Sequence, residues 1–145
     1  MAMNTSGEIE IKADPAAIMA TIADFSTYPE WSSAHKSATV EESDDQGRPT
    51  RVRMMMSMVG ISDEQLVDYT WDGEERVSWS LVESTQQRSQ EGFYEFTPTA
   101  QGTQVAFELN VDLKIPVPGF LLNRAKKSAL ETATRGLKKR VESLN

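Results

Sequence analysis

The segment from Pro116 to Asn145 ends the chain in one long helical pattern. Pro118 suits the first helical position, because its ring fixes φ near the helical value and its missing N–H costs nothing there. From residue 122 onward, apolar residues recur at helical spacing on one face, and charged residues occupy the opposite face. The apolar residues are Leu122, Ala125, Ala129, Leu130, Ala133, Leu137, Val141 and Leu144. A helix of roughly 40 Å therefore needs a large apolar surface to pack against.

Two residues interrupt the apolar face of this helix. Lys126 projects into its middle, and Gly136 lies on its flank. Glycine inside a helix costs about 1 kcal/mol relative to alanine, so we expect a neighbour to approach Gly136 closely. The face is also richer in alanine than in leucine, and small residues allow either tight packing or open space. The sequence leaves these two alternatives open.

The first part of the chain combines one strand with short helices. Acidic and apolar residues alternate over 8–13, which predicts a half-buried strand. Asp14 then supplies an N-cap and Pro15 a first helical residue for a short helix. The aromatic residues that follow are Phe25, Tyr28 and Trp31. Their density predicts a second short helix or turn that closes the end of a core.

Alternating segments with turns between them fill the middle of the chain. They cover 37–42, 50–59, 65–71, 77–81, 88–96 and 105–113. The connections are of hairpin length, which makes the predicted sheet antiparallel. Such a sheet must cover its apolar face, and the C-terminal helix is the only element long enough to do so. The sequence therefore predicts an α+β fold in a single domain, residues 1–145.

Composition excludes several classes of protein. Cysteine is absent, so disulfide and thiolate chemistry are excluded. Residues 1–12 hold no apolar core of signal-peptide length, and no run approaches a membrane span, which predicts a cytoplasmic protein. The formal net charge of −7 argues against nucleic acid as a partner.

Charge is distributed unevenly along the chain. Residues 117–145 hold seven Lys and Arg against two Glu, a balance of +5, so the remainder of the −7 chain carries −12. A solvated helix face explains this pattern, because cations complement the negative end of the helix dipole. The alternative is a docking patch for an acidic partner or a membrane surface.

Several short motifs resemble one protein superfamily. They are Tyr28-Pro29-Glu30-Trp31, Tyr69-Thr70-Trp71-Asp72, Val77-Ser78-Trp79, Gly92-Phe93-Tyr94-Glu95-Phe96, Gly102-Thr103 and Pro116-Val117-Pro118-Gly119-Phe120. In this order they resemble the START-like, helix-grip superfamily (SRPBCC), close to its polyketide cyclase/dehydrase branch. The resemblance implies a curved seven-stranded antiparallel sheet wrapped around the long C-terminal helix, with two short helices after the first strand. It also implies a hydrophobic cavity between sheet and helix, in which members bind lipids, sterols, polyketides, plant hormones or quinones.

The side chains predicted to face inward form the candidate binding site. They are Met54, Met56, Met58, Tyr69, Trp71, Trp79, Arg88, Gln90, Tyr94, Phe107 and Lys126. Methionines opposite aromatic residues with polar tips suit an adaptable apolar pocket, although the same pattern is typical of a plain core. Arg88, Gln90 and Lys126 need partners there, because an unpaired buried polar group costs several kcal/mol. Alternatively, Arg88 and Lys126 extend to the ends of the core.

Catalytic and metal-binding motifs are scarce. His35, the only histidine, shares strand parity with polar residues and is predicted to lie on the surface. One histidine without cysteine argues against a transition-metal site, and no nucleotide-binding glycine motif is present, so no cofactor is expected. If the protein is an enzyme, the candidate catalytic residues are Tyr69, Arg88 and Tyr94, as hydrogen-bond donors to a developing enolate.

Three functional hypotheses follow from this sequence. The favoured one is binding or transport of a hydrophobic small molecule, such as a lipid, a polyketide or a quinone-like compound, between sheet and helix. The second is an enzyme similar to polyketide cyclases and dehydrases, without metal or nucleotide cofactor. The third is a protein-interaction module that uses the basic outer face of the helix.

Overall fold

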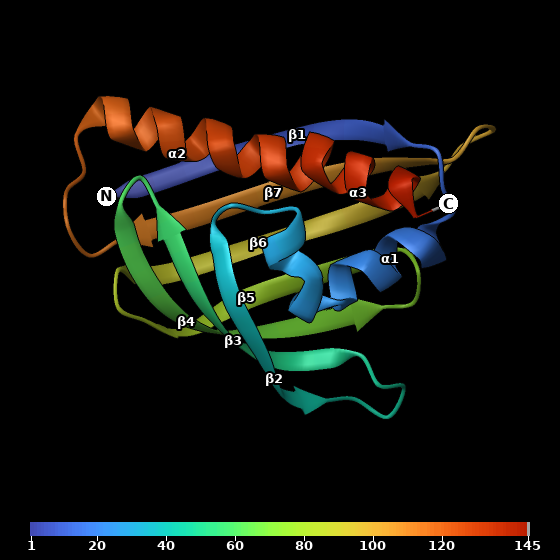
Figure 1. Cartoon of the computed structure of the whole chain (residues 1–145), viewed down its shortest axis with the longest axis horizontal. Helices are drawn as coiled ribbons and strands as arrows, with labels where there is room; N and C mark the ends of the chain where they lie inside the picture. Colours follow the sequence, from blue (N-terminus) through green and yellow to red (C-terminus); the bar gives the residue numbers. More distant parts are fainter. Residues whose placement is uncertain (145) are drawn as a thin grey trace.

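Seven strands pair side by side in one antiparallel sheet, and the C-terminal helix lies across its inner face (Figure 1). This computed structural model describes residues 1–144. The strands are β1 (Ala2–Ile11), β2 (His35–Ser43), β3 (Pro49–Met58), β4 (Ile61–Asp72), β5 (Arg76–Ser84), β6 (Gln87–Pro98) and β7 (Thr103–Leu113). Their order in the sheet is β1-β7-β6-β5-β4-β3-β2, and every neighbouring pair is antiparallel. The predicted helix-grip architecture is confirmed.

The first strand is longer than its sequence pattern predicts. It begins at Ala2 rather than at residue 8, because its N-terminal half pairs with β7, with Met3 opposite Val111. β1 stands first in the strand order, next to β7, and therefore forms one edge of the sheet. Cross-strand pairing, rather than local alternation, extends this strand.

Two short helices follow β1, as predicted. In α1 (Pro15–Ala23), the Asp14 side chain caps the first turn by accepting a hydrogen bond from the Ala17 N–H at 2.9 Å. The second, η1 (Phe25–Glu30), is a 3₁₀ helix whose Tyr28 hydroxyl donates to the Ile22 carbonyl at 2.6 Å. This bond ties η1 back to the end of α1.

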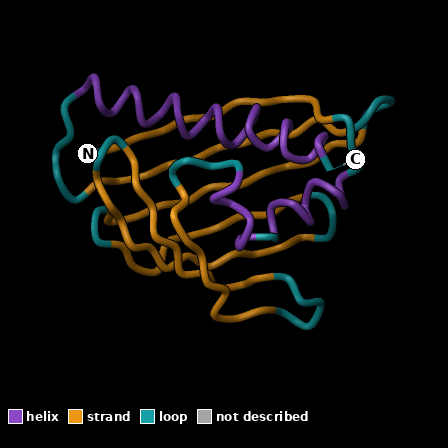
Figure 2. The backbone as a smooth tube through the Cα atoms, in the orientation of Figure 1, coloured by secondary structure: helices purple, strands orange, loops and turns teal. Residues whose placement is uncertain are grey.

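The C-terminal helix runs through three segments. They are α2 (Gly119–Glu131), the π-helical turn η2 (Thr132–Gly136) and α3 (Leu137–Ser143). Pro118 is the N-cap rather than the first helical residue, because its backbone is extended while its carbonyl accepts the Leu122 N–H at 3.0 Å. Figure 2 shows the three segments as one continuous helix across the sheet.

The predicted close approach at Gly136 is wrong, and it occurs instead at Gly7, Gly92 and Gly102. A Cβ built on Gly136 meets no heavy atom nearer than 3.7 Å, which is ordinary contact. A Cβ built on Gly92 of β6 would lie 2.4 Å from the Trp79 ring. Gly92 faces Trp79 across the β5–β6 pair, so the absence of a side chain lets the indole lie flat over β6.

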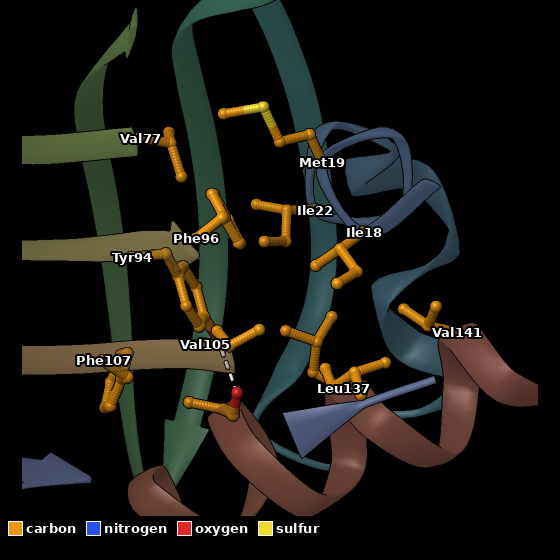
Figure 3. Close-up of a cluster of buried hydrophobic side chains, with 12 residues drawn as sticks. Ile18, Met19, Ile22, Val77, Tyr94, Phe96, Val105, Phe107, Leu137 and Val141 are labelled. Carbon is orange, nitrogen blue, oxygen red and sulfur yellow. Dashed lines mark hydrogen bonds between the residues drawn. The ribbon is translucent and has the colours of Figure 1, made fainter. Parts of the chain in front are cut away.

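The main core lies at the end of the sheet where α1 and α3 meet (Figure 3). Its members include Ile11, Ile18, Ile22, Val77, Phe96, Val105, Leu137 and Val141. In Figure 3 the Tyr94 ring reaches from β6 to the helix, where its hydroxyl donates to the Ala133 carbonyl at 3.0 Å. A second cluster, around Phe25, Val52 and Val67, joins η1 to β3 and β4.

Candidate functional site

A cavity of about 150 Å³ lies between the inner face of the sheet and the segment where α2 passes into η2. From the helix, Ser128, Ala129, Thr132 and Ala133 form its wall. Eight of the side chains predicted for the binding site line it. They are Met54, Met56, Met58, Tyr69, Trp79, Gln90, Tyr94 and Phe107. The alanines of the helix thus face open space, which decides between the two alternatives that the sequence left.

A second hollow of about 80 Å³ continues this cavity toward the start of α2. The two share the side chains of Met3, Met56, Met58, Gln65, Gln87 and Val111. Beyond them, the second hollow reaches Val59 in the β3–β4 turn and Val117 before α2. In Figure 2 these two connections lie at the N-terminal end of the molecule, away from α3.

Three of the predicted binding residues do not line either hollow. Trp71 packs into the core, and its indole N–H donates to the Pro49 carbonyl at 2.6 Å. Arg88 is exposed, because the register shift between Gln87 and Ser89 reverses the parity of the strand. The inward placement of Arg88 is therefore wrong.

Lys126 also lies outside the cavity walls. The preceding residue, Ala125, is the one that α2 buries, and Lys126 follows about 100° further round the helix. Its side chain is half-buried along the flank of the helix. Arg88 and Lys126 therefore follow the alternative expectation, in which their side chains extend out of the core.

His35 faces the cavity, although the sequence pattern predicts a surface position. The register shift between His35 and Ser37 at the start of β2 turns its ring inward. Its Nδ1 lies 2.6 Å from the Ser32 hydroxyl, and its ring edge packs against Tyr28. Burial lowers the pKa of His35 from 6.5 to about 4, so its imidazole is neutral at neutral pH.

A buried carboxylate, Asp63 of β4, is a site residue that the sequence reasoning missed. Its side chain lines the second hollow and the residue is 7% exposed. Its Oδ1 accepts the backbone N–H groups of Thr85 and Gln86 at 3.1 and 3.2 Å. The hydroxyls of Ser84 and Thr85 donate to the same oxygen at 2.6 and 2.9 Å. The tight β5–β6 connection therefore wraps around this carboxylate.

A row of glutamines connects Asp63 to the larger cavity. Gln65 and Gln87 donate through Nε2 to Asp63 Oδ2, at 2.8 and 3.2 Å. Gln90 donates through Nε2 to Gln87 Oε1 at 2.8 Å and to Gln65 Oε1 at 3.4 Å. At the far end, the Trp79 indole N–H donates to Gln90 Oε1 at 3.0 Å. We call Gln65, Gln87 and Gln90 the glutamine row.

Strand parity contains a signal for part of this network. Gln65 and Asp63 continue, two residues at a time, the inward set of Val67 and Tyr69 on β4. The predicted strand began at residue 65 and therefore omitted Asp63. No comparable signal exists for His35, because a β-bulge is set by pairing with a distant strand.

The two tyrosines predicted as catalytic candidates both line the cavity. Burial raises the pKa of Tyr69 and Tyr94, so both phenols are protonated at neutral pH. The Tyr94 hydroxyl is engaged by Ala133, whereas no hydrogen bond joins the Tyr69 hydroxyl to any residue of 1–144. Tyr69 is therefore the better placed of the two to donate to a bound molecule. Their catalytic role remains a prediction.

The charged outer face of the helix is partly paired within the molecule. Lys138 forms an ion pair with Glu142 and donates to the Glu10 carbonyl at 3.1 Å. Arg140 pairs with Glu30 of η1 at 3.2 Å. The contacts with Glu10 and Glu30 hold α3 to β1 and η1. Docking of an acidic partner on this face remains a prediction.

No group of three or more His, Cys, Asp or Glu side chains in residues 1–144 is placed to hold a metal ion. No helix in the same range is both long enough and apolar enough to cross a bilayer.

Residues 3–142 match the family described as "Polyketide cyclase / dehydrase and lipid transport". No functionally curated protein matches the sequence. Among solved structures, a START superfamily protein from Mycobacterium smegmatis is similar, with 25% identity, a TM-score of 0.86 and coverage of 98% of this chain and 99% of that chain.

Two more distant structures share the fold. A protein of Thermus thermophilus is 24% identical, with a TM-score of 0.79 over 98% of this chain and 99% of that one. The Zhui aromatase/cyclase from a Streptomyces species is 9% identical, with a TM-score of 0.80 over 98% of this chain and 94% of that one. Because the family match spans nearly the whole chain, this protein belongs to the polyketide cyclase/dehydrase and lipid transport family of the START-like (SRPBCC) superfamily.

Proposed function

We propose that this protein binds and carries a hydrophobic small molecule in the cavity beneath α2 and η2. The observation that carries the proposal is the wall itself, in which methionines and aromatic rings face a stripe of alanines. Unbranched methionine side chains adapt to irregular ligands, and alanine leaves the space free. The family description, which includes lipid transport, supports the same role. We also propose that the protein acts in the cytoplasm as one domain.

The volume of the cavity is compatible with such a ligand. An engineered apolar cavity of about 150 Å³ in another protein takes up benzene, and the cavity here is of the same size, at about 150 Å³. The adjoining hollow of about 80 Å³ adds room for a longer molecule. A ligand with one or two rings, or a short hydrocarbon chain, is therefore the expected guest.

Filling the cavity tests the proposal directly. Ala129→Leu places extra atoms on the cavity wall, whereas Asn123→Leu adds the same side chain to an exposed position of the same helix. Native mass spectrometry of the freshly purified protein should show a bound small molecule, and displacement of a fluorescent apolar probe should give its affinity. We expect Ala129→Leu to weaken probe binding by tenfold or more, and Asn123→Leu to leave it unchanged. Equal affinity in both variants would reject the cavity as the binding site.

A second candidate function is catalysis of a cyclisation or dehydration. The observation that favours it is the imidazole of His35, which is held neutral at the cavity wall beside Ser32. A neutral imidazole can take a proton from carbon next to a ligand carbonyl, while the Tyr69 hydroxyl donates to the developing oxyanion. The catalytic role predicted for Arg88 is withdrawn, because its side chain is exposed.

The two functions predict different behaviour of the recovered ligand. An enzyme should convert its co-purified molecule on incubation, with loss of one water by mass spectrometry for a dehydration, or with an isomer of equal mass and different chromatographic retention for a cyclisation. His35→Gln and Tyr69→Phe should then abolish the conversion while leaving probe affinity within about twofold. A carrier shows no conversion in either the original protein or the variants.

A further inference from the structure

The walls of the cavity carry very little charge. Among the residues that line the two hollows, Asp63 is the only Asp, Glu, Lys or Arg, and burial keeps His35 neutral. Neither wall includes a lysine or an arginine, because Arg88 and Lys126 lie outside them. A ligand carboxylate or phosphate would therefore lose its hydration without gaining a cationic partner.

The hydrogen-bond row that begins at Asp63 has one possible direction. Backbone N–H groups can only donate, so the Asp63 carboxylate accepts from the β5–β6 connection and also accepts from Gln65 and Gln87. At the other end, the Trp79 indole N–H can also only donate, so the carbonyl oxygen of Gln90 must face it. An acceptor-only group at one end and a donor-only group at the other thus orient all three amides.

At Gln90, this direction leaves only an acceptor to face the ligand. Both N–H groups of Gln90 are used, one on Gln87 and one on Gln65. Each of the three amide oxygens accepts one hydrogen bond within the row and retains a second lone pair. The negative ends of the amide dipoles point away from Asp63 and toward the larger cavity. A group that donates a hydrogen bond fits the free lone pair of Gln90, and a carboxylate, which only accepts, does not.

We infer that the ligand is an uncharged alcohol or phenol whose hydroxyl donates to the glutamine row, and that ligands bearing a carboxylate are rejected. This inference rests on the proposed binding function and specifies the chemical class of the ligand. The hydroxyl lies beside Gln90, where Trp79 and Phe107 supply an aromatic surface for a ring. The hydrocarbon part of the ligand extends between the methionines of β3 and the alanines of the helix.

Three matched probes separate the features of this ligand. They are a naphthol, its methyl ether and the naphthoate with its carboxylate at the same ring position. The naphthol donates a hydrogen bond, the ether only accepts one, and the naphthoate is an anion at neutral pH. Isothermal titration calorimetry on the full chain, after extraction of any co-purified molecule, gives the three affinities.

The expected order is naphthol, then ether, then naphthoate. One net hydrogen bond should make the naphthol bind about threefold to tenfold more tightly than the ether. The naphthoate should bind at least tenfold more weakly than the naphthol, because its desolvation is uncompensated. Gln90→Met removes the amide at similar volume and should bring the naphthol to within about twofold of the ether. Gln101→Met, in an exposed turn, should leave the order intact.

Each other outcome overturns a defined statement. If the naphthoate binds as tightly as the naphthol, the inferred ligand class is wrong while the binding function stands. If the ether equals the naphthol in the original protein, or if Gln90→Met keeps the difference, the glutamine row does not recognise a hydroxyl. If none of the three probes binds and the fluorescent apolar probe fails as well, the proposed binding function fails with it.

Discussion

The two ends of the C-terminal helix pack against the same sheet in opposite ways. At the α3 end, Leu137 and Val141 are 0% and 1% exposed and lie in the main core. At the α2 end, Ala125 is the residue that the helix buries, and it lines the second hollow, while Ala129 lines the larger cavity. The helix is amphipathic throughout. Amphipathicity therefore places a helix on a sheet, while the volume of its inward side chains decides whether the interface is solid.

A third layer contributes to the difference. Helix α1 packs against α3, so the core there is closed from two sides (Figure 1). Ile18, Met19 and Ile22 of α1 fill the space that remains between α3 and the strands (Figure 3). No element of residues 1–144 plays this part at the other end, where the β3–β4 turn and the β7–α2 connection border the second hollow.

The polar groups of the two ends also differ. In the main core, polar side chains bond to backbone carbonyls, as Thr103 does to Ala13 at 2.7 Å. Around the cavity, polar side chains bond mainly to one another, in the row from Asp63 to Trp79. Hydrogen bonds to the backbone stabilise the fold itself, whereas the glutamine row has free lone pairs that can accept a hydrogen bond from a ligand.

The largest expected effect is a difference between two leucine truncations. Leu137→Ala should lower the free energy of unfolding by about 3 kcal/mol, because it leaves a cavity in a solid core. Leu122→Ala, at the hollow end, should cost about 1 kcal/mol or less, since this side chain is only partly buried. Urea unfolding followed by tryptophan fluorescence measures both. Equal losses would contradict the contrast between the two ends.

Acid should destabilise the protein by protonating His35, which lines the cavity. The pKa of His35 is about 4 in the folded state and 6.5 in the unfolded chain, so the unfolded chain binds the extra proton between these values. The contribution of His35 to the free energy of unfolding is fully present above pH 6.5 and is lost as the pH drops toward 4. The whole contribution amounts to about 3 kcal/mol. The quantity to measure is the free energy of unfolding against pH for the original protein and for His35→Gln. Parallel curves for the two proteins would show that His35 is not buried as a neutral ring.

Overpacking beside the cavity should be tolerated better than overpacking in a core. In Gly92→Ala, the new methyl collides with the Trp79 ring, which can move toward the open cavity. We expect a loss of about 1 to 2 kcal/mol in unfolding free energy, together with a clear loss of probe binding as the indole occupies the space. Retained probe affinity in a folded Gly92→Ala variant would mean that the ring stays in place.

The smallest expected effect concerns η2, the turn that joins α2 to α3. Gly136 has helical backbone angles and free space around its α-carbon. Gly136→Ala should therefore stabilise the protein by about 0.5 to 1 kcal/mol, because alanine lowers the entropy of the unfolded chain. Thermal unfolding provides the test, with probe binding as the control. A destabilised variant would show that the π-helical turn η2 requires glycine.

The sequence predicted the architecture because the relevant signals are local. Alternation with period two, turns of hairpin length and a long amphipathic helix lead to one antiparallel sheet covered by one helix. The same parity placed Met54, Tyr69 and Tyr94 on the cavity wall, since their strands are regular at those positions. These predictions needed no knowledge of which strands meet.

The site was predicted less completely because bulges are tertiary features. One extra residue near Arg88 and one near His35 reverse which way each side chain points, and nothing in the local pattern marks them. The neutral state of His35 follows from its burial, and the bonds of Asp63 come from a hairpin about 20 residues further along the chain.

By itself, the sequence determined the elements, their antiparallel arrangement and the apolar face of the final helix. Only the tertiary structure decided that the alanines of α2 face a cavity while the leucine and valine of α3 complete a solid core. The physical reason is that packing density depends on the side chains opposite, and these are supplied by β3 to β7 and by α1. A helical pattern states which face is buried, and the partners across the interface determine how much of that face is filled.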